Sequence, residues 1–349
     1  MWFMTMKTVF ASLCMSTAMM GVATSAFADG EVNIYSYRQP ELIKPLIEEF
    51  TKETGIKANV LFLDKGLVER IQAEGANSPA DVILTVDISR LTQAKEAGVT
   101  QPVTSDIINK DIPEHFRDPD GNWFGLTTRG RVVYASRERV SQDSITYEEL
   151  ADPKWKGKIC TRDFQHSYNV GLTASILAHK GEEETEKWLT GLKNNLARKP
   201  DGNDREQAKA IASGECDLGL GNTYYVGLMM TNKKEPEQQE WAKAIKVLFP
   251  NANDRGTHVN ISGMAMAKNA PDKENALKFM EFLASGKAQQ IYGEQVFEYP
   301  VMPGAEPSDI VKSFGAIKPD SLSLADIAAN RKKASELIDK VGINDGPSN

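Results

Sequence analysis

The sequence has few of the residues that most often build metal sites in proteins. Only three cysteines and four histidines occur among its 349 residues. None of the histidines has the spacing of a paired metal ligand, and no His-Glu-x-x-His motif is present. A zinc site built on cysteine pairs would need further ligands, and none is suitably spaced. The composition therefore argues against the common cysteine and histidine zinc sites.

Long apolar runs are also missing after the first residues of the chain. Lys7, a mostly apolar stretch from Thr8 to about Val22, and the small-x-small sequence Ala26-Phe27-Ala28 are typical of a Sec signal peptide. That apolar stretch is too short to span about 30 Å of hydrocarbon, and no later segment is apolar enough to do so. We expect residues 1–28 to be a signal peptide and the mature protein to lie in the periplasm.

An excess of positive charge is absent as well. The chain holds 41 lysines and arginines against 48 acidic residues, a net charge of −7, and the two signs are interspersed. Binding of nucleic acid needs a concentrated basic surface, so we expect no nucleic-acid partner.

The two cysteines that follow the signal peptide have similar settings. Cys160 and Cys216 each lie eight residues before a tyrosine, Tyr168 and Tyr224. This symmetry suggests that the two are close in space, and an oxidising compartment allows a disulfide between them. Two separate buried thiols are the alternative.

The first part of the mature chain alternates strands with helices. Strand patterns at 32–36, 56–62 and 81–85 are separated by helical patterns from 42 to 50 and from 67 to 73, and a further helix is expected at 91–97. This alternation predicts an α/β lobe with a largely parallel sheet. Ligands bind at the carboxyl ends of such strands, here residues 36–39, 64–66 and 85–87.

Two further strand patterns indicate a second lobe. The segment 123–134 reads as a strand that leaves the first lobe, and 260–267 as one that returns to it. The predicted division is a discontinuous N-terminal lobe and a C-terminal lobe, made of residues 29–128 with 252–302 and of residues 129–251 with 303–349.

An adjacent pair of tyrosines, Tyr224 and Tyr225, lies in the small and glycine-flanked segment 219–227. Gly221 and Asn222 leave the backbone uncovered beside both rings. A phenol is neutral near pH 7 with a pKa of about 10, but beside a hard and highly charged cation it can lose its proton and bind as an anionic oxygen. Ferric iron is the simplest such cation. A pair that only packs and hydrogen-bonds is the alternative.

Several blocks along the chain together resemble the periplasmic ferric-iron-binding proteins of ABC transporters. Their joint order and spacing carry the resemblance, which covers essentially the whole mature chain; the blocks are Tyr35-Ser36-Tyr37-Arg38-Gln39-Pro40, Asp64-Lys65-Gly66-Leu67-Val68, Ser78-Pro79-Ala80-Asp81-Val82, Trp123-Phe124-Gly125-Leu126-Thr127-Thr128-Arg129, Ser167-Tyr168-Asn169-Val170 and Asn222-Thr223-Tyr224-Tyr225. The family implies a two-lobe, type 2 periplasmic-binding-protein fold with crossover strands as a hinge.

The resemblance also implies a transferrin-like site. Its iron ligands here would be Tyr168, Tyr224 and Tyr225, all from the predicted second lobe. Three phenolates would balance the charge of Fe(3+), and a synergistic anion, carbonate or bicarbonate, would complete a shell of hard oxygen ligands.

The anion would need cationic donors. Arg38 and Arg129 are the predicted ones, because a guanidinium matches a planar oxyanion, and Gln39 would add a neutral donor. Arg131 would point to the same face of the strand as Arg129 and is an alternative to it. Some relatives use a first-lobe residue as a further metal ligand, and Glu41 is the candidate here, although a glutamate at a helix start is commonly exposed.

We therefore expect a monomeric, non-enzymatic carrier that delivers ferric iron to an inner-membrane ABC permease and its ATPase. One alternative is a protein of the same fold that binds a small organic or phosphorus-containing anion. Another is a periplasmic hydrolase that uses Asp64 or Asp87. The absence of a nucleophile motif or a paired acid and base argues against the hydrolase.

Overall fold

The computed structural model describes residues 1–2 and 30–347. The predicted signal peptide, residues 1–28, therefore lies almost entirely outside the described residues. Within the described ranges, none of the helices is both long enough and apolar enough to span a bilayer.

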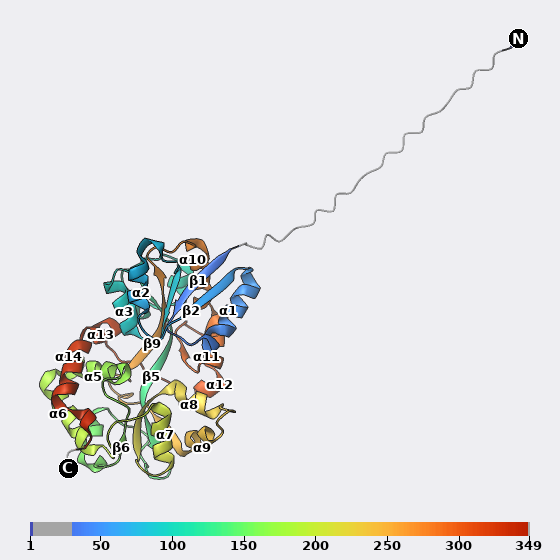
Figure 1. The fold of residues 1–349 in the computed structure, drawn as a ribbon. Coiled ribbons are helices and arrows are strands. Elements are labelled where there is room, and N and C mark those ends of the chain that lie inside the picture. The colour runs from blue at the N-terminus through green and yellow to red at the C-terminus, as the bar shows by residue number, and fades with distance from the viewer. Residues whose placement is uncertain (3–29, 348–349) are drawn as a thin grey trace.

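The protein has two lobes, one above the other in Figure 1. The sheet of the first lobe has the central order β2-β1-β3-β9-β5, with β4 beside β9 and β10 beside β5. Its strands are β1 (Glu31–Ser36), β2 (Lys57–Phe62), β3 (Val82–Thr85), β4 (Thr100–Gln101), the first half of β5 (Phe124–Ser136), β9 (Val259–Ala267) and β10 (Tyr299–Pro300).

The prediction of a largely parallel sheet is wrong for much of this lobe. Strand β1 pairs in parallel with β2 and β3, but β9 is antiparallel to both β3 and β5. The reason is that β5 and β9 carry the chain out of the lobe and back, so they run in opposite directions.

Strand β5 joins the two lobes. Its residues up to Gly130 pair with β9, and from Arg131 onward it pairs with β7 and β8 in the second sheet. That sheet consists of β6 (Ile159–Cys160), β7 (Leu218–Asn222), β8 (Ile245–Leu248) and the second half of β5. The predicted strand between lobes is confirmed, and it places one continuous segment in both sheets.

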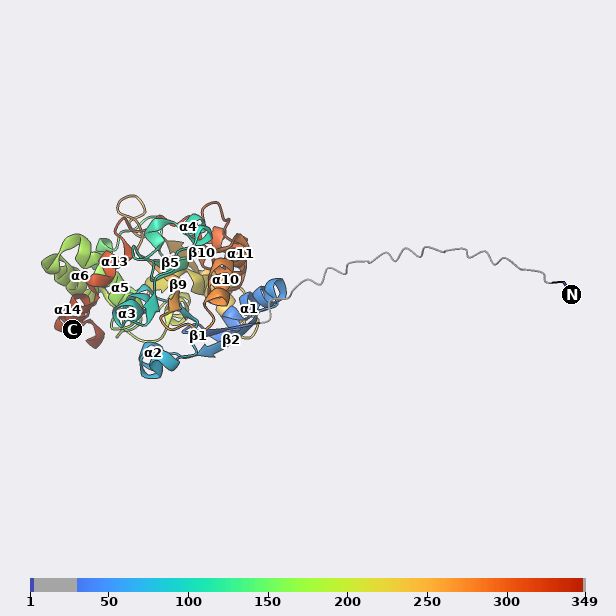
Figure 2. The ribbon, with the colours of Figure 1, turned by 90° about the horizontal axis from the view of Figure 1, so that it is seen from above.

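Helices cover both sheets. Seen from above in Figure 2, α1, α10 and α11 lie on one side of β1 and β2, and α2 and α3 lie toward the other. The helices of the first lobe are α1 (Pro40–Thr54), α2 (Leu67–Glu74), α3 (Ile88–Glu96), α4 (Asp106–Asp111), α10 (Lys273–Ala284) and α11 (Gly286–Gln295). Helix α1 ends where predicted, because Gly55 takes the left-handed conformation, with φ of 74°.

The remaining helices surround the second sheet and connect it to the first lobe. They are α5 (Ser167–Lys180), α6 (Glu182–Asn195), α7 (Asp204–Ala212), α8 (Thr223–Met230), α9 (Glu237–Ala244), α12 (Asp309–Phe314), α13 (Leu324–Ala329) and α14 (Arg331–Val341). Helix α13 contacts both α3 and α5. Its Leu324 belongs to the apolar core of the first lobe and its Ile327 to that of the second, so the C-terminal helices span the junction.

A disulfide joins Cys160 and Cys216, with Cα atoms 5.9 Å apart. Of the two alternatives that the sequence left open, the bridge is therefore the one observed. It ties the end of β6 to the residues that lead into β7 and then into the tyrosine pair. The lobe boundaries predicted from the sequence stay predictions.

Candidate functional site

A cavity of about 470 Å³ lies at the junction of the two lobes. Its lining includes most of the residues selected from the sequence: Arg38, Gln39, Glu41, Arg129, Tyr168, Tyr224 and Tyr225. They come from four separate segments of the chain. The fold therefore brings together side chains up to 187 positions apart, as the numbers of Arg38 and Tyr225 show.

The three tyrosines all lie in the first turn of a helix. Tyr168 is the second residue of α5, and Tyr224 and Tyr225 are the second and third of α8. The phenol oxygens of Tyr168 and Tyr224 are 3.1 Å apart, and the rings of Tyr224 and Tyr225 have centroids 4.2 Å apart. Helix N-termini carry partial positive charge, so both helices favour negative charge on these phenol oxygens.

Burial holds the phenols of the tyrosine pair in their neutral form. Burial first, then the neighbouring Tyr168 and Tyr225, raises the pKa of Tyr224 well above its usual 10. Burial, Tyr168 and Asp204 raise the pKa of Tyr225 to about 12. Both rings are partly buried. A cation that binds here as a phenolate complex must therefore displace protons.

His166, which the sequence did not place among the ligands, caps the helix that carries Tyr168. Its Nδ1 accepts a hydrogen bond from the backbone N–H of Tyr168 at 3.3 Å, and the two rings pack edge to face with centroids 4.5 Å apart. Burial, together with Arg162 and Arg131, lowers the pKa of His166 to about 4. The imidazole is therefore a neutral acceptor near pH 7 that fixes the start of α5.

Arg38 and Arg129 meet at one hydroxyl. Both side chains are almost fully buried, and Arg38 Nη2 and Arg129 Nη1 donate to Ser262 Oγ, the latter at 3.3 Å. Arg129 Nε has no hydrogen-bond partner although it is buried. The two guanidiniums therefore form a cationic wall of the cavity.

Glu298, which no sequence pattern singled out, completes this wall. It lies directly before β10 and lines the cavity, with 1% of its surface exposed. Its Oε1 accepts from Arg38 Nη2 at 2.9 Å, and its Oε2 accepts from Ser262 at 2.7 Å and from Thr127. Burial favours the neutral acid, but Arg38, Arg129 and these hydrogen bonds outweigh it and lower the pKa of Glu298 to about 2.

Arg131 does not line the cavity. Its Nη1 donates to Asp204 at 2.7 Å and to Asn222, and its other nitrogens donate to Asn169. The sequence predicted that Arg129 and Arg131 lie on one face of the strand. The guanidinium carbon of each lies 5.9 Å from the ring centroid of Tyr168. Since every side-chain nitrogen of Arg131 donates to a protein acceptor and only Arg129 lines the cavity, Arg129 is the better placed of the two for an anion.

Gln39 and Glu41 lie at the exposed start of α1, on the rim of the cavity. Arg205, which no sequence pattern indicated, also lines the cavity, with its guanidinium carbon 5.4 Å from the ring centroid of Tyr225. Its place in the first turn of α7 gives no local signal of this position. The rim is therefore polar, with charges of both signs.

The strand ends behave as predicted in two cases out of three. The ends of β1 and β3 reach the cavity through Tyr37 and Val86, whereas residues 64–66 do not. Asp64 is exposed, and Asp87 caps α3 by accepting from the Ser89 N–H at 2.8 Å. Neither carboxylate lines the cavity, so the site holds no support for a hydrolase built on them.

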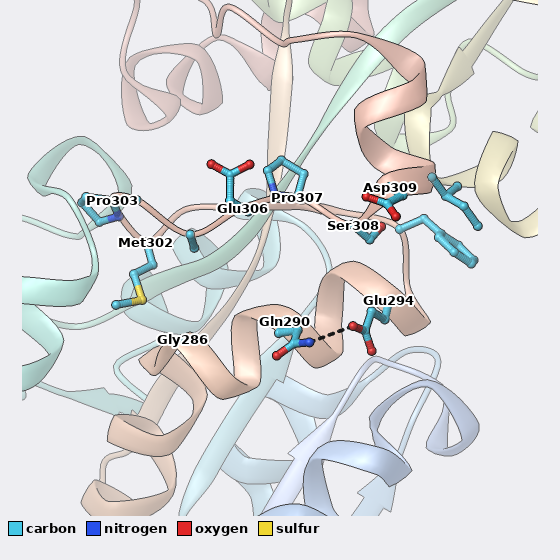
Figure 3. Close-up of a pocket in the computed structure, with 13 residues that line it drawn as sticks. Gly286, Gln290, Glu294, Met302, Pro303, Glu306, Pro307, Ser308 and Asp309 are labelled. Carbon is cyan, nitrogen blue, oxygen red and sulfur yellow. Dashed lines mark hydrogen bonds between the residues drawn. The ribbon is translucent and has the colours of Figure 1, made fainter.

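Among the described residues, no group of three or more histidine, cysteine, aspartate or glutamate side chains could hold a metal. A second cavity of about 680 Å³ lies between α11 and the segment 302–310 (Figure 3). Its polar lining includes Gln290, Glu294, Glu306 and Asp309 but no tyrosine or arginine. The cavity lined by Tyr168, Tyr224 and Tyr225 is therefore the better candidate for a ferric site.

Comparison with known proteins gives consistent relatives. A family described as "Bacterial extracellular solute-binding protein" matches residues 45–319. The "Iron uptake protein A1" of Synechocystis is 45% identical, covering 89% of this chain and 87% of the relative. Among solved structures, a Bordetella ferric binding protein is 48% identical with a TM-score of 0.86, over 90% of this chain and 99% of its own.

A Trichodesmium protein solved in complex with iron and citrate ligands is 45% identical, with a TM-score of 0.85, again over 90% and 99% of the two chains. These relatives confirm the resemblance to ferric-iron-binding proteins and the two-lobe fold. The chain thus belongs to the family of bacterial extracellular solute-binding proteins.

Proposed function

We propose that this protein captures ferric iron in the periplasm as a complex with Tyr168, Tyr224, Tyr225 and a synergistic anion. The observation that carries the proposal is the meeting of the phenol oxygens of Tyr168 and Tyr224, 3.1 Å apart, beside the ring of Tyr225 in one cavity. Anionic oxygens are the ligands that a hard trivalent cation prefers. The names of relatives at 45–48% identity, which refer to iron uptake, ferric binding or a complex with iron, point the same way.

The anion, carbonate or bicarbonate, would bind at the wall formed by Arg38 and Arg129. The position of both buried guanidiniums in the cavity lining supports this proposal, because a guanidinium is a charge-assisted donor to an oxyanion. Gln39 is a neutral donor on the rim, and Glu41, which also lines the cavity, is the candidate for a first-lobe metal ligand. The loaded protein would act without catalysis and, as a monomer, pass the iron to an ABC permease and its ATPase.

An absorption spectrum tests the proposal directly. Ferric iron added to the purified protein with bicarbonate should give an orange to red colour from tyrosinate-to-iron charge transfer. Stoichiometric ferric iron without that band would overturn the phenolate site. A chain that binds a small organic or phosphorus-containing anion would bind its ligand without colour.

A further inference from the structure

Glu298 is a charged group in the cavity wall. The proposed binding of iron by three tyrosinates and an anion gives this residue no role. Its carboxylate is buried, and it touches the guanidinium that would hold the anion. Both of its oxygens accept hydrogen bonds from Arg38, Ser262 and Thr127, all within the first lobe. The carboxylate therefore stays ionised and stays in place.

This carboxylate changes the charge that an incoming anion meets. Arg38 and Arg129 would present two positive charges, and Glu298 removes one of them. The other charged residues of the lining, Glu41 and Arg205, have opposite signs and lie at the wetter rim. The cavity wall therefore carries about one net positive charge, and a low local dielectric makes that charge count in binding.

Glu298 also occupies donors. Arg38 Nη2 is directed at Glu298 and Ser262, so this nitrogen is not free for a second oxyanion. A large anion with several carboxylates would bring extra negative charge beside Glu298 and would find fewer donors to satisfy it. A small anion would need fewer donors and would bring less negative charge beside Glu298.

We propose that Glu298 determines which synergistic anion the site accepts, by favouring carbonate or bicarbonate over multiply charged anions such as citrate. The inference rests on the proposed function, because it concerns the anion of the same iron site. Because Glu298 is paired with Arg38, the predicted donor to the anion, it would be a specificity residue of the anion half-site.

The test compares the wild-type protein with Glu298→Gln, which keeps the shape of the side chain and removes its charge. Ferric iron is titrated against a chelator with either bicarbonate or citrate as the only added anion, and binding is followed through the tyrosinate-to-iron band. We expect the preference of the wild type for bicarbonate to fall on the order of tenfold in Glu298→Gln, which is about 1.4 kcal/mol.

Glu294→Gln is the matched control, because Glu294 lies four residues away on α11 and faces the second cavity (Figure 3). It should keep the wild-type preference. Glu298→Asp, which retains the charge, should keep much of it as well. An unchanged preference in Glu298→Gln with a normal colour would overturn this inference and leave the proposed function standing.

The wild type provides a second readout that does not depend on the folding of a variant. Equal iron retention with bicarbonate and citrate in the wild type would overturn the inference whatever Glu298→Gln does. Absence of the tyrosinate band with either anion would instead contradict the proposed iron site itself.

Discussion

The two sides of the cavity have opposite chemistry. The second lobe contributes three phenols, each in the first turn of a helix. The first lobe and the adjoining part of β5 contribute Arg38 and Arg129, with Glu298 paired to Arg38. Anionic ligands for a cation thus face cationic donors for an anion. A cation could be held by the tyrosine side alone, and the anion would then connect it to the arginine side.

This difference suggests that substitutions on the two sides of the cavity affect iron binding in different ways. Loss of a phenol removes a bond to the metal and should act whether the lobes are open or closed. Loss of an arginine weakens the anion and should act mainly on the strength and anion dependence of binding. The tyrosine variants and Arg129→Ala below each change one side and leave the other intact.

The largest effect is expected from the tyrosine side. Tyr224→Phe or Tyr225→Phe removes a charged ligand with little change in volume, so each should bleach much of the charge-transfer band and weaken iron retention more than hundredfold, since even outer-sphere partners of a metal contribute about 10–100-fold. Chelator competition measures this loss. Tyr35→Phe is the control, because Tyr35 lies outside the cavity and donates to Glu74. Full retention of colour in either variant at the pair would refute the phenolate ligands.

The next largest effect should be the dependence of iron affinity on pH. The raised pKa values of Tyr224 and Tyr225 keep both phenols protonated in the empty protein near pH 7, so binding of iron as a phenolate complex releases their protons. The bound state holds fewer protons, and affinity must therefore rise with pH and fall on acidification. We expect iron loss to begin below neutrality and to be steeper than a single titration.

Chelator competition across pH, with and without bicarbonate, measures that slope. Acidification also removes carbonate, so bicarbonate should shift the release to lower pH. An affinity independent of pH would contradict a site made of ionised phenols.

Substitutions of Arg129 and Arg131, the two arginines of β5, should separate an effect on iron binding from an effect on stability. Arg129→Ala should reduce iron affinity and its dependence on bicarbonate, because the anion loses a charge-assisted donor. Arg131→Ala should instead destabilise the fold by about 3 kcal/mol, because it removes one partner of the buried Asp204 carboxylate. Iron titration and chemical denaturation of both variants make the comparison. Reduced iron affinity in Arg131→Ala and reduced stability in Arg129→Ala would instead indicate that Arg131 binds the anion.

The smallest effect on the site is expected from the disulfide. Cys160→Ser with Cys216→Ser opens a bridge between residues 56 positions apart and should lower the free energy of unfolding by about 2–4 kcal/mol. Neither sulfur lines the cavity, so the colour of the iron-loaded protein should persist. Thermal unfolding with and without reductant checks the first expectation, and a spectrum checks the second. Loss of the band in a folded variant would show that the bridge positions the tyrosines.

Much of the first lobe was accessible from local patterns. The strands and helices from residue 31 to 96 have close to their predicted bounds, because their apolar periodicity is strong and glycines such as Gly55 mark the ends. The direction of the sheet was less accessible. Strand β9 enters from 259 onward, and no local pattern tells whether a distant strand joins in parallel or antiparallel.

The residues of the site also divide into those that the sequence indicated and those that only the fold revealed. The sequence by itself determined that Tyr224 and Tyr225 are adjacent, and the succession of blocks pointed to Tyr168, Arg38 and Arg129. Only the tertiary structure decided that Arg131 turns to Asp204, and that Glu298 joins Arg38 across 260 positions. The physical reason is that periodicity and capping act over a few residues. The partner of a buried charge is instead whichever group the folded chain places within a few ångströms.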